Sequence, residues 1–231
     1  MNQVKHQTEI ASYIGRLLRD NFGKGPDSVY VSIGHPFIVV YIRNLMSPTE
    51  RVLMAQQQET LLQITRDTVM QTLIPDIKAS IRHVAGMEVK EFYYDWNLHN
   101  KSAVFVLTCV DLNVVAESVS VDYPHKKELH QEILNLSIQS EKPPVEILSY
   151  LINPRTLVVI RNGILVAIEK QLIRLGQEEQ LRIAKRALEK SLLHNNHFES
   201  VLNSKITDSF VDWDFELDRS LIIFILTPGD A

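Results

Sequence analysis

The spacing of apolar residues predicts two helices and two hairpins in the first half of the chain. Apolar positions recur at helical spacing from Ile10 to Leu18, and Phe22-Gly23 is a helix stop. Residues 29–33 alternate as a half-buried strand does, and the dense apolar run from Phe37 to Ile42 predicts a buried strand. The turn signal Gly34-His35-Pro36 lies between them, so we expect a hairpin.

A long helix should follow this hairpin. The segment Ser47-Pro48-Thr49-Glu50 combines a cap residue, a proline at the first helical position and an acidic first turn. We expect the helix to bend at Pro75 and to end at Gly86. Residues 89–96 and 103–110 then predict a second hairpin around the turn at 97–101.

The second half repeats this order. The pattern predicts a helix at 129–138, strands at 147–151 and 156–161, one helix at 168–193, and strands at 204–213 and 221–226. Each half is therefore an αββαββ unit. Since hairpins form antiparallel pairs, we expect an α+β fold in which each unit is an antiparallel four-stranded sheet with helices packed on one face.

The sequence itself also repeats. Residues 36–44 (PFIVVYIRN) return as 154–162 (PRTLVVIRN) with a shift of 118 positions, Asp95-Trp96 returns as Asp212-Trp213, and Leu107 aligns with Leu226. A period above one hundred residues indicates a domain duplication rather than a solenoid. We assign residues 1–112 to the first unit, 113–127 to a linker and 128–231 to the second unit, and expect an intramolecular pseudo-twofold pair whose function involves both halves.

Composition and charge narrow the function classes. The longest apolar runs are far below the roughly 20 residues of a membrane-spanning helix. The N-terminus shows no secretory pattern and Cys109 is the single cysteine, which favours the cytoplasm. The net charge is −4 and neither half is basic; Lys126-Lys127 is a solvated pair in the linker. We therefore expect no nucleic-acid partner.

Lys24 and Gly25 belong to the one glycine-rich loop, Gly23-Lys24-Gly25-Pro26. Such a loop could present backbone N–H groups and a positive charge to an anion. The loop follows a helix instead of preceding one, however, and a glycine that simply ends the helix explains it better. In the second unit the segment Glu141-Lys142-Pro143-Pro144 has no glycine.

Arg43-Asn44 and Arg161-Asn162 are the candidates for a role shared by both units. An arginine at a strand end could bind a carboxylate, phosphate or bicarbonate, although an ion pair to a neighbouring carboxylate is the commoner use. The repeated Asp-Trp pair fits an anchored tryptophan beside a turn-forming aspartate without any ligand.

Catalytic and metal signals are weak. His194 and His197 could meet on one helical face, but a third ligand is missing, and solvated helix-end residues are the better interpretation. Cys109 lies in an apolar strand, which is typical of an inert thiol. Without a Ser-His-Asp order or paired carboxylates in a known context, we expect no catalytic residues, no metal and no cofactor.

One family resemblance emerges from the first unit. The succession 22–26 (FGKGP), 45–50 (LMSPTE), 73–75 (LIP) and 84–89 (VAGMEV), followed by Asp95 and 104–107 (VFVL), resembles the MpsC family, whose name refers to a Na+-translocating, membrane potential-generating system. The resemblance covers residues 9–111 and extends by internal homology to 128–227. The second copy lacks counterparts of Gly23, Gly25, Pro48, Pro75 and Gly86.

The resemblance implies a soluble, non-enzymatic accessory protein at the inner face of a membrane, associated with ion movement or inorganic-carbon (bicarbonate) uptake and with transporter subunits as partners. A cytoplasmic sensor of a small anion or nucleotide, using Lys24, Arg43 and Arg161, is the alternative. A hydrolase with an unrecognised active site is the third. If relatives with one unit form homodimers, this chain is a fused dimer, and a fragment ending near Leu112 should self-associate.

Overall fold

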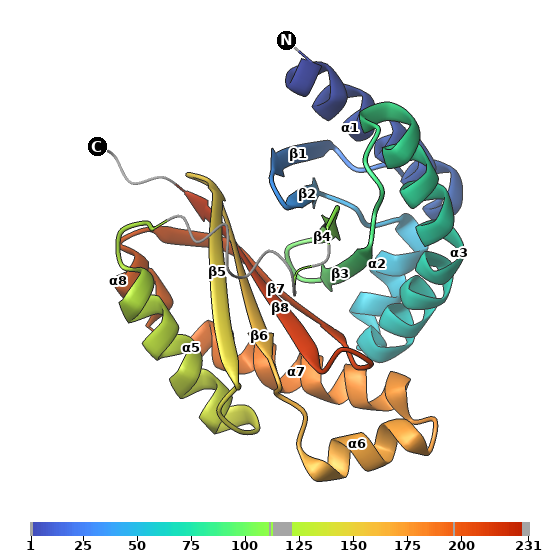
Figure 1. The fold of residues 1–231 in the computed structure, drawn as a ribbon. Coiled ribbons are helices and arrows are strands. Elements are labelled where there is room, and N and C mark those ends of the chain that lie inside the picture. Colours follow the sequence, from blue (N-terminus) through green and yellow to red (C-terminus); the bar gives the residue numbers. More distant parts are fainter. Residues whose placement is uncertain (1, 111, 113–121, 196, 228–231) are drawn as a thin grey trace. The chain divides into compact units, whose positions relative to one another are not determined.

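The protein is described here from a computed structural model that covers residues 2–110, 112, 122–195 and 197–227. The chain divides into two compact units, residues 1–115 and 116–231, and each is described by itself (Figure 1). The elements of the first unit are α1 (Asn2–Phe22), β1 (Ser28–Gly34), β2 (Phe37–Arg43), α2 (Pro48–Ala55), α3 (Glu59–Ala85), β3 (Glu91–Asn97) and β4 (Ser102–Thr108). Those of the second unit are α5 (Lys126–Ser140), β5 (Glu146–Asn153), β6 (Thr156–Asn162), α6 (Ala167–Arg174), α7 (Glu178–Asn195), α8 (Phe198–Leu202), β7 (Lys205–Asp214) and β8 (Arg219–Thr227).

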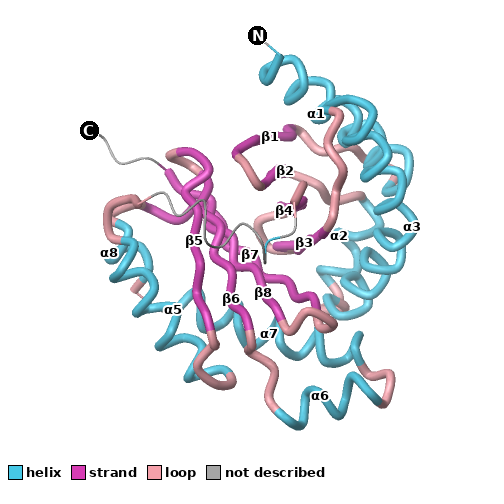
Figure 2. Tube along the Cα trace, viewed as in Figure 1, coloured by secondary structure: helices cyan, strands magenta, loops and turns pink. Residues whose placement is uncertain are grey.

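Both units have the same sheet topology. The strand orders are β1-β2-β4-β3 and β5-β6-β8-β7, and all neighbouring strands are antiparallel. Figure 2 shows the helices of each unit gathered on one side of its sheet. The predicted α+β fold with two repeated units is therefore confirmed, whereas the pseudo-twofold pairing of the units stays a prediction.

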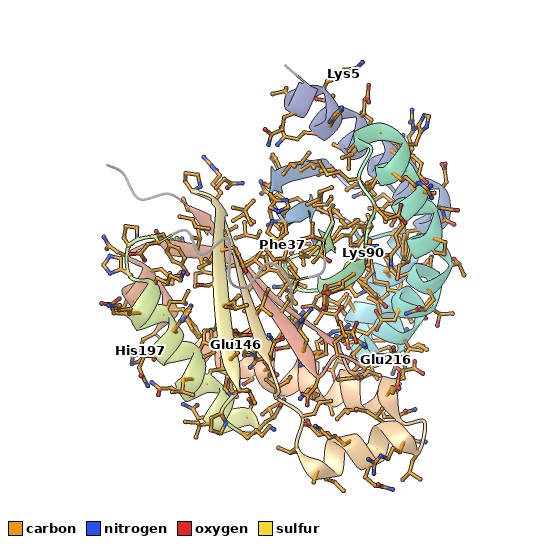
Figure 3. All side chains as sticks on the ribbon, in the orientation of Figure 1. Lys5, Phe37, Lys90, Glu146, His197 and Glu216 are labelled. Atoms are coloured by element: carbon orange, nitrogen blue, oxygen red, sulfur yellow. The ribbon has the colours of Figure 1, made fainter. Side chains whose placement is uncertain are left out.

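Alternation along the strands gives each unit its own core. In β2, Ile38, Val40 and Ile42 point to the helices, where they pack with Trp96 and Phe105. In the second unit, Leu157 and Val159 of β6 join Trp213 and Phe224 beneath α5 and α7. The side chains that fill these layers are drawn in Figure 3.

The long helix predicted in each unit is interrupted. In the first unit it breaks between α2 and α3, where Gln57 has a left-handed φ of 58° and the N–H of Gln58 bonds to Leu53 O at 2.9 Å. In the second unit, Gly176 (φ 74°) occupies the same place and Gln177 N–H reaches Leu172 O at 2.9 Å. One left-handed residue ends a helix because it turns the chain away from the helical path. The expected single helix at 168–193 was therefore wrong.

Three further details differ from the sequence expectations. The α-helix α3 continues through Pro75, and the interruption lies sixteen or more residues earlier, at 56–58. The short helix α8 was not predicted. Lys126 and Lys127 are the first residues of α5 rather than linker residues, and the central part of the expected linker, 113–121, lies outside the described residues.

Candidate functional site

The first unit brings its predicted site residues together at one corner of the sheet. The loop 23–27 runs beside the end of β2, because Asp27 N–H donates to Arg43 O at 3.0 Å. The Asn44 amide also donates to the Asp27 carboxylate. Lys24 and Gly25 thus lie in a loop that is tied to Arg43 and Asn44 by one aspartate.

The charges of this corner are exposed. The Arg43 side chain is exposed and Lys24 is half-buried. The Arg19 side chain lies against Gly25, since a Cβ added to Gly25 would come within 2.9 Å of Arg19 Nε. The corner can therefore present Arg19, Lys24 and Arg43 to an anion, but the Asp27 carboxylate in its centre would oppose that binding.

Arg161 does not occupy the position of Arg43. In the first sheet Ile42 pairs with Ala103, and Ala103 pairs in turn with Trp96. In the second sheet Arg161 pairs with Ser220, and Ser220 pairs in turn with Trp213. The counterpart of Arg161 is therefore Ile42, and that of Arg43 is Asn162. The shift of 118 positions inferred from the repeated motif is wrong by one residue in these strands.

A β-bulge explains the error. The pairing of β5 with β6 shifts between Leu151 and Asn153, which places one additional residue in β5. Backbone conformation supports the corrected register, because Asn44 (φ 55°) and its new counterpart Gly163 (φ 69°) are both left-handed. Successive strand residues face opposite sides of a sheet, so a shift of one residue moves an arginine from solvent to the core. A similar correction applies to Leu107, whose counterpart is Phe224 and not Leu226.

Arg161 is buried in an ion-pair network. Its Nε donates to Ser220 Oγ at 2.8 Å, a second nitrogen lies 3.2 Å from Ser137 Oγ, and the third donates to Glu189. Both Arg161 and Glu189 are at most 1% exposed. Asn162 bonds instead to Glu146 Oε2 at 2.7 Å and accepts from Arg219 Nε at 2.8 Å.

A cluster of a glutamate, a cation and a tryptophan is the feature that the two units do share. In the first unit, Arg66 forms a two-point ion pair with Glu50, with N–O distances of 2.7 and 3.0 Å, and its guanidinium lies 4.9 Å from the Trp96 ring centre. Arg66 also donates to Leu45 O at 2.8 Å. Burial alone would raise the pKa of Glu50, but the hydrogen bonds and charge of Arg66, with the Ser47 N–H, hold it below its ordinary value.

The second unit repeats this cluster with a lysine. Lys185 Nζ lies 2.8 Å from Glu169 Oε1 and 5.6 Å from the centre of the Trp213 ring. Each glutamate also accepts a backbone N–H at the start of its helix, from Ser47 in the first unit and from Val166 in the second. The cluster therefore fastens the helix pair (α2 and α3, or α6 and α7) to the sheet in both units.

The sequence analysis missed this cluster, although a signal was present. Glu50 and Arg66 are separated by 16 residues, and so are Glu169 and Lys185. Aligning the units on charge pairs, rather than on the apolar strand motif, would have shown the correct register.

The second unit adds buried charges that the first unit lacks. Lys185 pairs with Glu141 as well as Glu169, and Glu189 pairs with Arg161. The residues at the positions of Glu141, Glu189 and Arg161 in the first unit are Gly23, Met70 and Ile42. Burial, with the negative charge of Glu189, raises the pKa of Glu141 to about 7 despite the opposing charge of Lys185.

A serine–histidine contact also appears in the second unit. His130 Nε2 lies 2.7 Å from Ser149 Oγ, which accepts from Tyr123 at 2.6 Å. Burial lowers the pKa of His130, with a smaller contribution from the Lys126 charge. Ser149 is 3% exposed, so these contacts satisfy a buried hydroxyl rather than present a nucleophile to a substrate.

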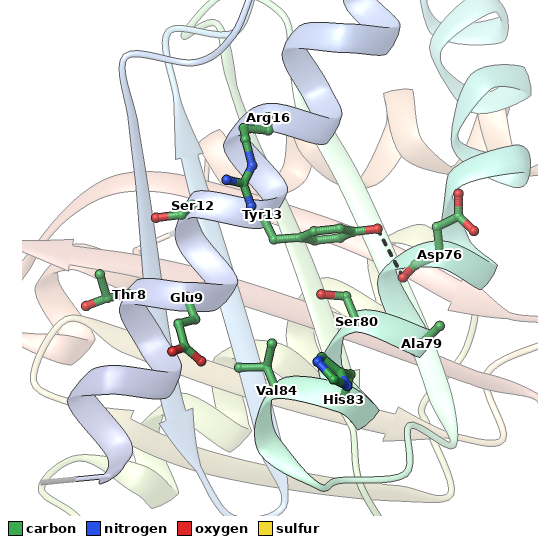
Figure 4. Close-up of a pocket in the computed structure, with 10 residues that line it drawn as sticks. All are labelled: Thr8, Glu9, Ser12, Tyr13, Arg16, Asp76, Ala79, Ser80, His83 and Val84. Carbon is green, nitrogen blue, oxygen red and sulfur yellow. Dashed lines mark hydrogen bonds between the residues drawn. The ribbon is translucent and has the colours of Figure 1, made fainter.

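A shallow groove of about 820 Å³ runs between α1 and α3. Tyr13 OH donates to Asp76 O at 3.3 Å within it, and the groove is lined by the polar side chains of Arg16, Ser80 and His83 (Figure 4). Sequence reasoning gave no sign of this groove, because its polar residues are spaced as on any solvated helix face.

The two units differ most clearly on the surface around α6. In the second unit this surface, which we call the apolar rim, exposes Val145 (83%), Ile168 (66%), Leu175 (64%) and Leu217 (43%). The corresponding residues of the first unit are all polar: Asp27, Thr49, Gln56 and Asn100. Val145 lies against the backbone of Gly163, at the end of β6. The Gly163 N–H donates to the backbone oxygen of Asp218 at 2.7 Å, and Asp218 directly follows Leu217. Val145 and Leu217 therefore lie at neighbouring strand ends.

The two histidines weighed as metal ligands flank the end of α7. His194 lies in the last turn of α7 and His197 precedes α8, and in the described part of the chain no group of three or more histidine, cysteine or acidic residues could hold a metal ion. Over the same residues, no helix combines the length and apolarity that crossing a bilayer requires. Burial raises the pKa of the Cys109 thiol, which makes it a poor nucleophile at neutral pH.

Comparison with known proteins gives a family match over both units. The model of the family described as "Na+-translocating membrane potential-generating system (MpsC)" matches residues 2–110 and again residues 126–228. The uncharacterized protein YbcI of Bacillus subtilis (strain 168) is 27% identical over 115 residues, which are 49% of this chain and 93% of YbcI. No solved structure matches the chain.

Proposed function

The chain belongs to the MpsC family, and on that premise we propose that it is a non-enzymatic accessory protein of a Na+-translocating, membrane potential-generating system. The observation that carries this proposal is the family match to both units. The Glu–cation–Trp cluster shared by both units supports the proposal further. The cluster is buried and holds helices to a sheet, so its role is structural and the surface is left free to bind a partner.

We place the partner contact on the apolar rim of the second unit. The fold does not require apolar residues there, since the first unit carries polar residues at the same four positions. Exposed apolar side chains on one face typically mark a contact with another molecule. The exposed charged residues of α6 are Lys170 and Arg174, because its one carboxylate, Glu169, is buried against Lys185.

These features define the chemistry of the partner. The occupant is a segment of a membrane subunit that offers apolar side chains to Ile168 and Leu175 and a carboxylate to Arg174, because Lys170 already pairs with Asp218 at 2.8 Å. Apolar burial would supply most of the affinity, and the charges would orient the partner. The protein would then work on the cytoplasmic side, at the face of the membrane.

The test is capture of the tagged chain from gently solubilised membranes of the native cell. We expect a multi-span membrane protein to co-purify with the natural chain and to be lost with the variant I168T/L175Q/L217N, in which each residue is replaced by that of the first unit. The matched control is Val52→Gln, which puts the residue of the second unit (Gln171) on α2. Equal recovery with all three chains would overturn the proposed surface.

A second candidate function is binding of a small anion at the corner of the first unit. The observation that favours it is that Asp27 joins the loop of Lys24 and Gly25 to the strand end of Arg43, with Arg19 lying against Gly25. Bicarbonate or phosphate should then raise the melting temperature, and Arg43→Ala should abolish the shift while Arg51→Ala keeps it. An unchanged melting temperature with both anions would remove this candidate.

A further inference from the structure

Glu141 lies where α5 joins the buried charges of the second unit. It follows the last residue of α5, and its N–H donates to Ser137 O at 2.9 Å. Its carboxylate contacts Lys185 of α7, whose ammonium also binds Glu169 of α6. One lysine therefore joins the end of α5 to the start of α6.

The groups that face Glu141 come from several elements. They are Lys185 and Glu189 of α7 and Glu169 of α6. Arg161 of β6 neutralises Glu189, and the Trp213 ring of β7 covers Lys185. The two cations Lys185 and Arg161 thus face three carboxylates, so the negative charge of Glu141 is only partly compensated.

The first unit shows that the fold does not need this carboxylate. Gly23 stands at the same position, directly after α1, where its N–H donates to Arg19 O at 3.0 Å just as that of Glu141 donates to Ser137 O. Arg66, the counterpart of Lys185, pairs with one carboxylate among the described residues, that of Glu50. The second unit therefore has a titratable carboxyl group at a helix end where the first unit has a glycine.

We propose that Glu141 is a proton-controlled latch, which holds the end of α5 against α6 and α7 when its carboxyl is protonated and releases it when the carboxyl is ionised. The direction follows from burial: the charged form is disfavoured in the closed position and is stable in water, so a rise in pH favours opening. With the pKa raised from its ordinary value of 4.5 to about 7 in the closed position, opening becomes easier as the pH rises between these values and levels off above them.

The latch connects to the apolar rim through a short segment. Residues 142–144 lead from Glu141 to Val145, whose N–H donates to Asn162 O at 2.8 Å at the start of β5. Burial acts to raise the pKa of Asp218, but the hydrogen bonds from Lys170 and the Leu165 N–H, the Lys170 charge and, least, the Lys142 charge hold it below its ordinary value. Opening of the latch would loosen this segment. The latch itself does not depend on the proposed partner, so it can be tested on the isolated full chain.

Amide hydrogen exchange of the full chain, measured between pH 5 and 8 and corrected for intrinsic rates, tests the latch. The amides of Glu141 and Val145 report on it. We expect their opening equilibrium to rise by up to about tenfold per pH unit from pH 5 to 7 and to level off above. In Glu141→Gln the same amides should show no such dependence. The amide of Gly23 in the first unit is the internal control and should not respond.

Two outcomes would overturn the latch. The first is protection at Glu141 and Val145 in the natural chain that does not change with pH. The second is a pH dependence that persists in Glu141→Gln, which would assign it to another group such as His130. Carboxyl chemical shifts of Glu141, followed through the same pH range, would show its titration directly even if the exchange were too fast to measure.

Discussion

Trp96 and Trp213 occupy the same position in the two sheets, and each covers the cation of a buried ion pair, Arg66 in the first unit and Lys185 in the second. Their indole N–H groups differ, however. That of Trp96 donates to Asp67 Oδ1 at 3.0 Å, while that of Trp213 has no hydrogen-bond partner among the described residues. The position of Asp67 is taken by Arg186 in the second unit. Both units therefore retain the glutamate, the cation and the tryptophan, whereas the residue at the position of Asp67 differs.

Removal of Arg66 should strongly destabilise the first unit. Arg66→Ala leaves the buried Glu50 carboxylate without its ion pair, and we expect a loss of about 3–5 kcal/mol in the free energy of unfolding. Arg66→Lys introduces the cation of the second unit and should cost much less. Urea unfolding followed by Trp96 fluorescence, in a Trp213→Phe background, measures both. Equal losses for the two variants would contradict a role for the charge.

Acid should destabilise the first unit through Glu50. Because the pKa of Glu50 is held below its ordinary value of 4.5 in the folded state, its contribution is present above that value and is lost as the pH falls through the folded pKa. Urea midpoints between pH 6 and 3 measure the loss. Glu50→Gln should lower stability at pH 6 and flatten this part of the profile; an unchanged slope would show that another carboxyl is responsible.

Arg161 and Glu189 should behave as a coupled pair. Arg161→Ile alone leaves Glu189 buried without a partner and should cost about 3–5 kcal/mol. The double variant Arg161→Ile, Glu189→Met restores the residues of the first unit at both positions, and we expect it to recover most of that loss. A double-mutant cycle by urea unfolding gives the coupling energy. Additive single effects would contradict the pair.

Gly163 should tolerate asparagine better than alanine. Its φ of 69° is left-handed, and an added Cβ would lie 2.5 Å from Val145 Cγ2. We expect Gly163→Ala to cost roughly 1–3 kcal/mol. Gly163→Asn, the residue of the first unit, should cost less because asparagine adopts this conformation more readily. Thermal unfolding of both variants, each with and without Val145→Ala, separates backbone strain from the contact.

The apolar pattern was sufficient to predict the repeated order of helical segments and strand pairs, since hairpins and amphipathic helices are local features, but it did not show that the second helical segment is divided in each unit. It could not give the register between the units. The motif ending in Arg43-Asn44 and Arg161-Asn162 looked equivalent, but one additional residue in β5 places Arg161 at the position of Ile42. A bulge adds a single residue to one strand, and this changes the spacing of the apolar residues too little to be recognised in one sequence.

The candidate site was harder to predict for the same reason. The anion site predicted at Lys24 and Arg43 stays a prediction; the structure adds that the loop and the strand end are joined through Asp27. The ion pair weighed for Arg161 is present, with Glu189 as its partner. The buried carboxylates Glu141 and Glu189 escaped notice because they are far apart in sequence and look like solvated helix residues. Their burial depends on tertiary packing, which local patterns do not contain.

Contact between the apolar rim and a membrane subunit of an ion-translocating system can be tested by site-specific photo-crosslinking in native membranes. The photoreactive residue is placed at position 175 in one chain and, in another, at its counterpart, position 56, directly after α2. We expect a crosslink from position 175 to a multi-span membrane protein of that system and none from position 56. Equal labelling from both positions, or labelling from position 56 alone, would contradict it.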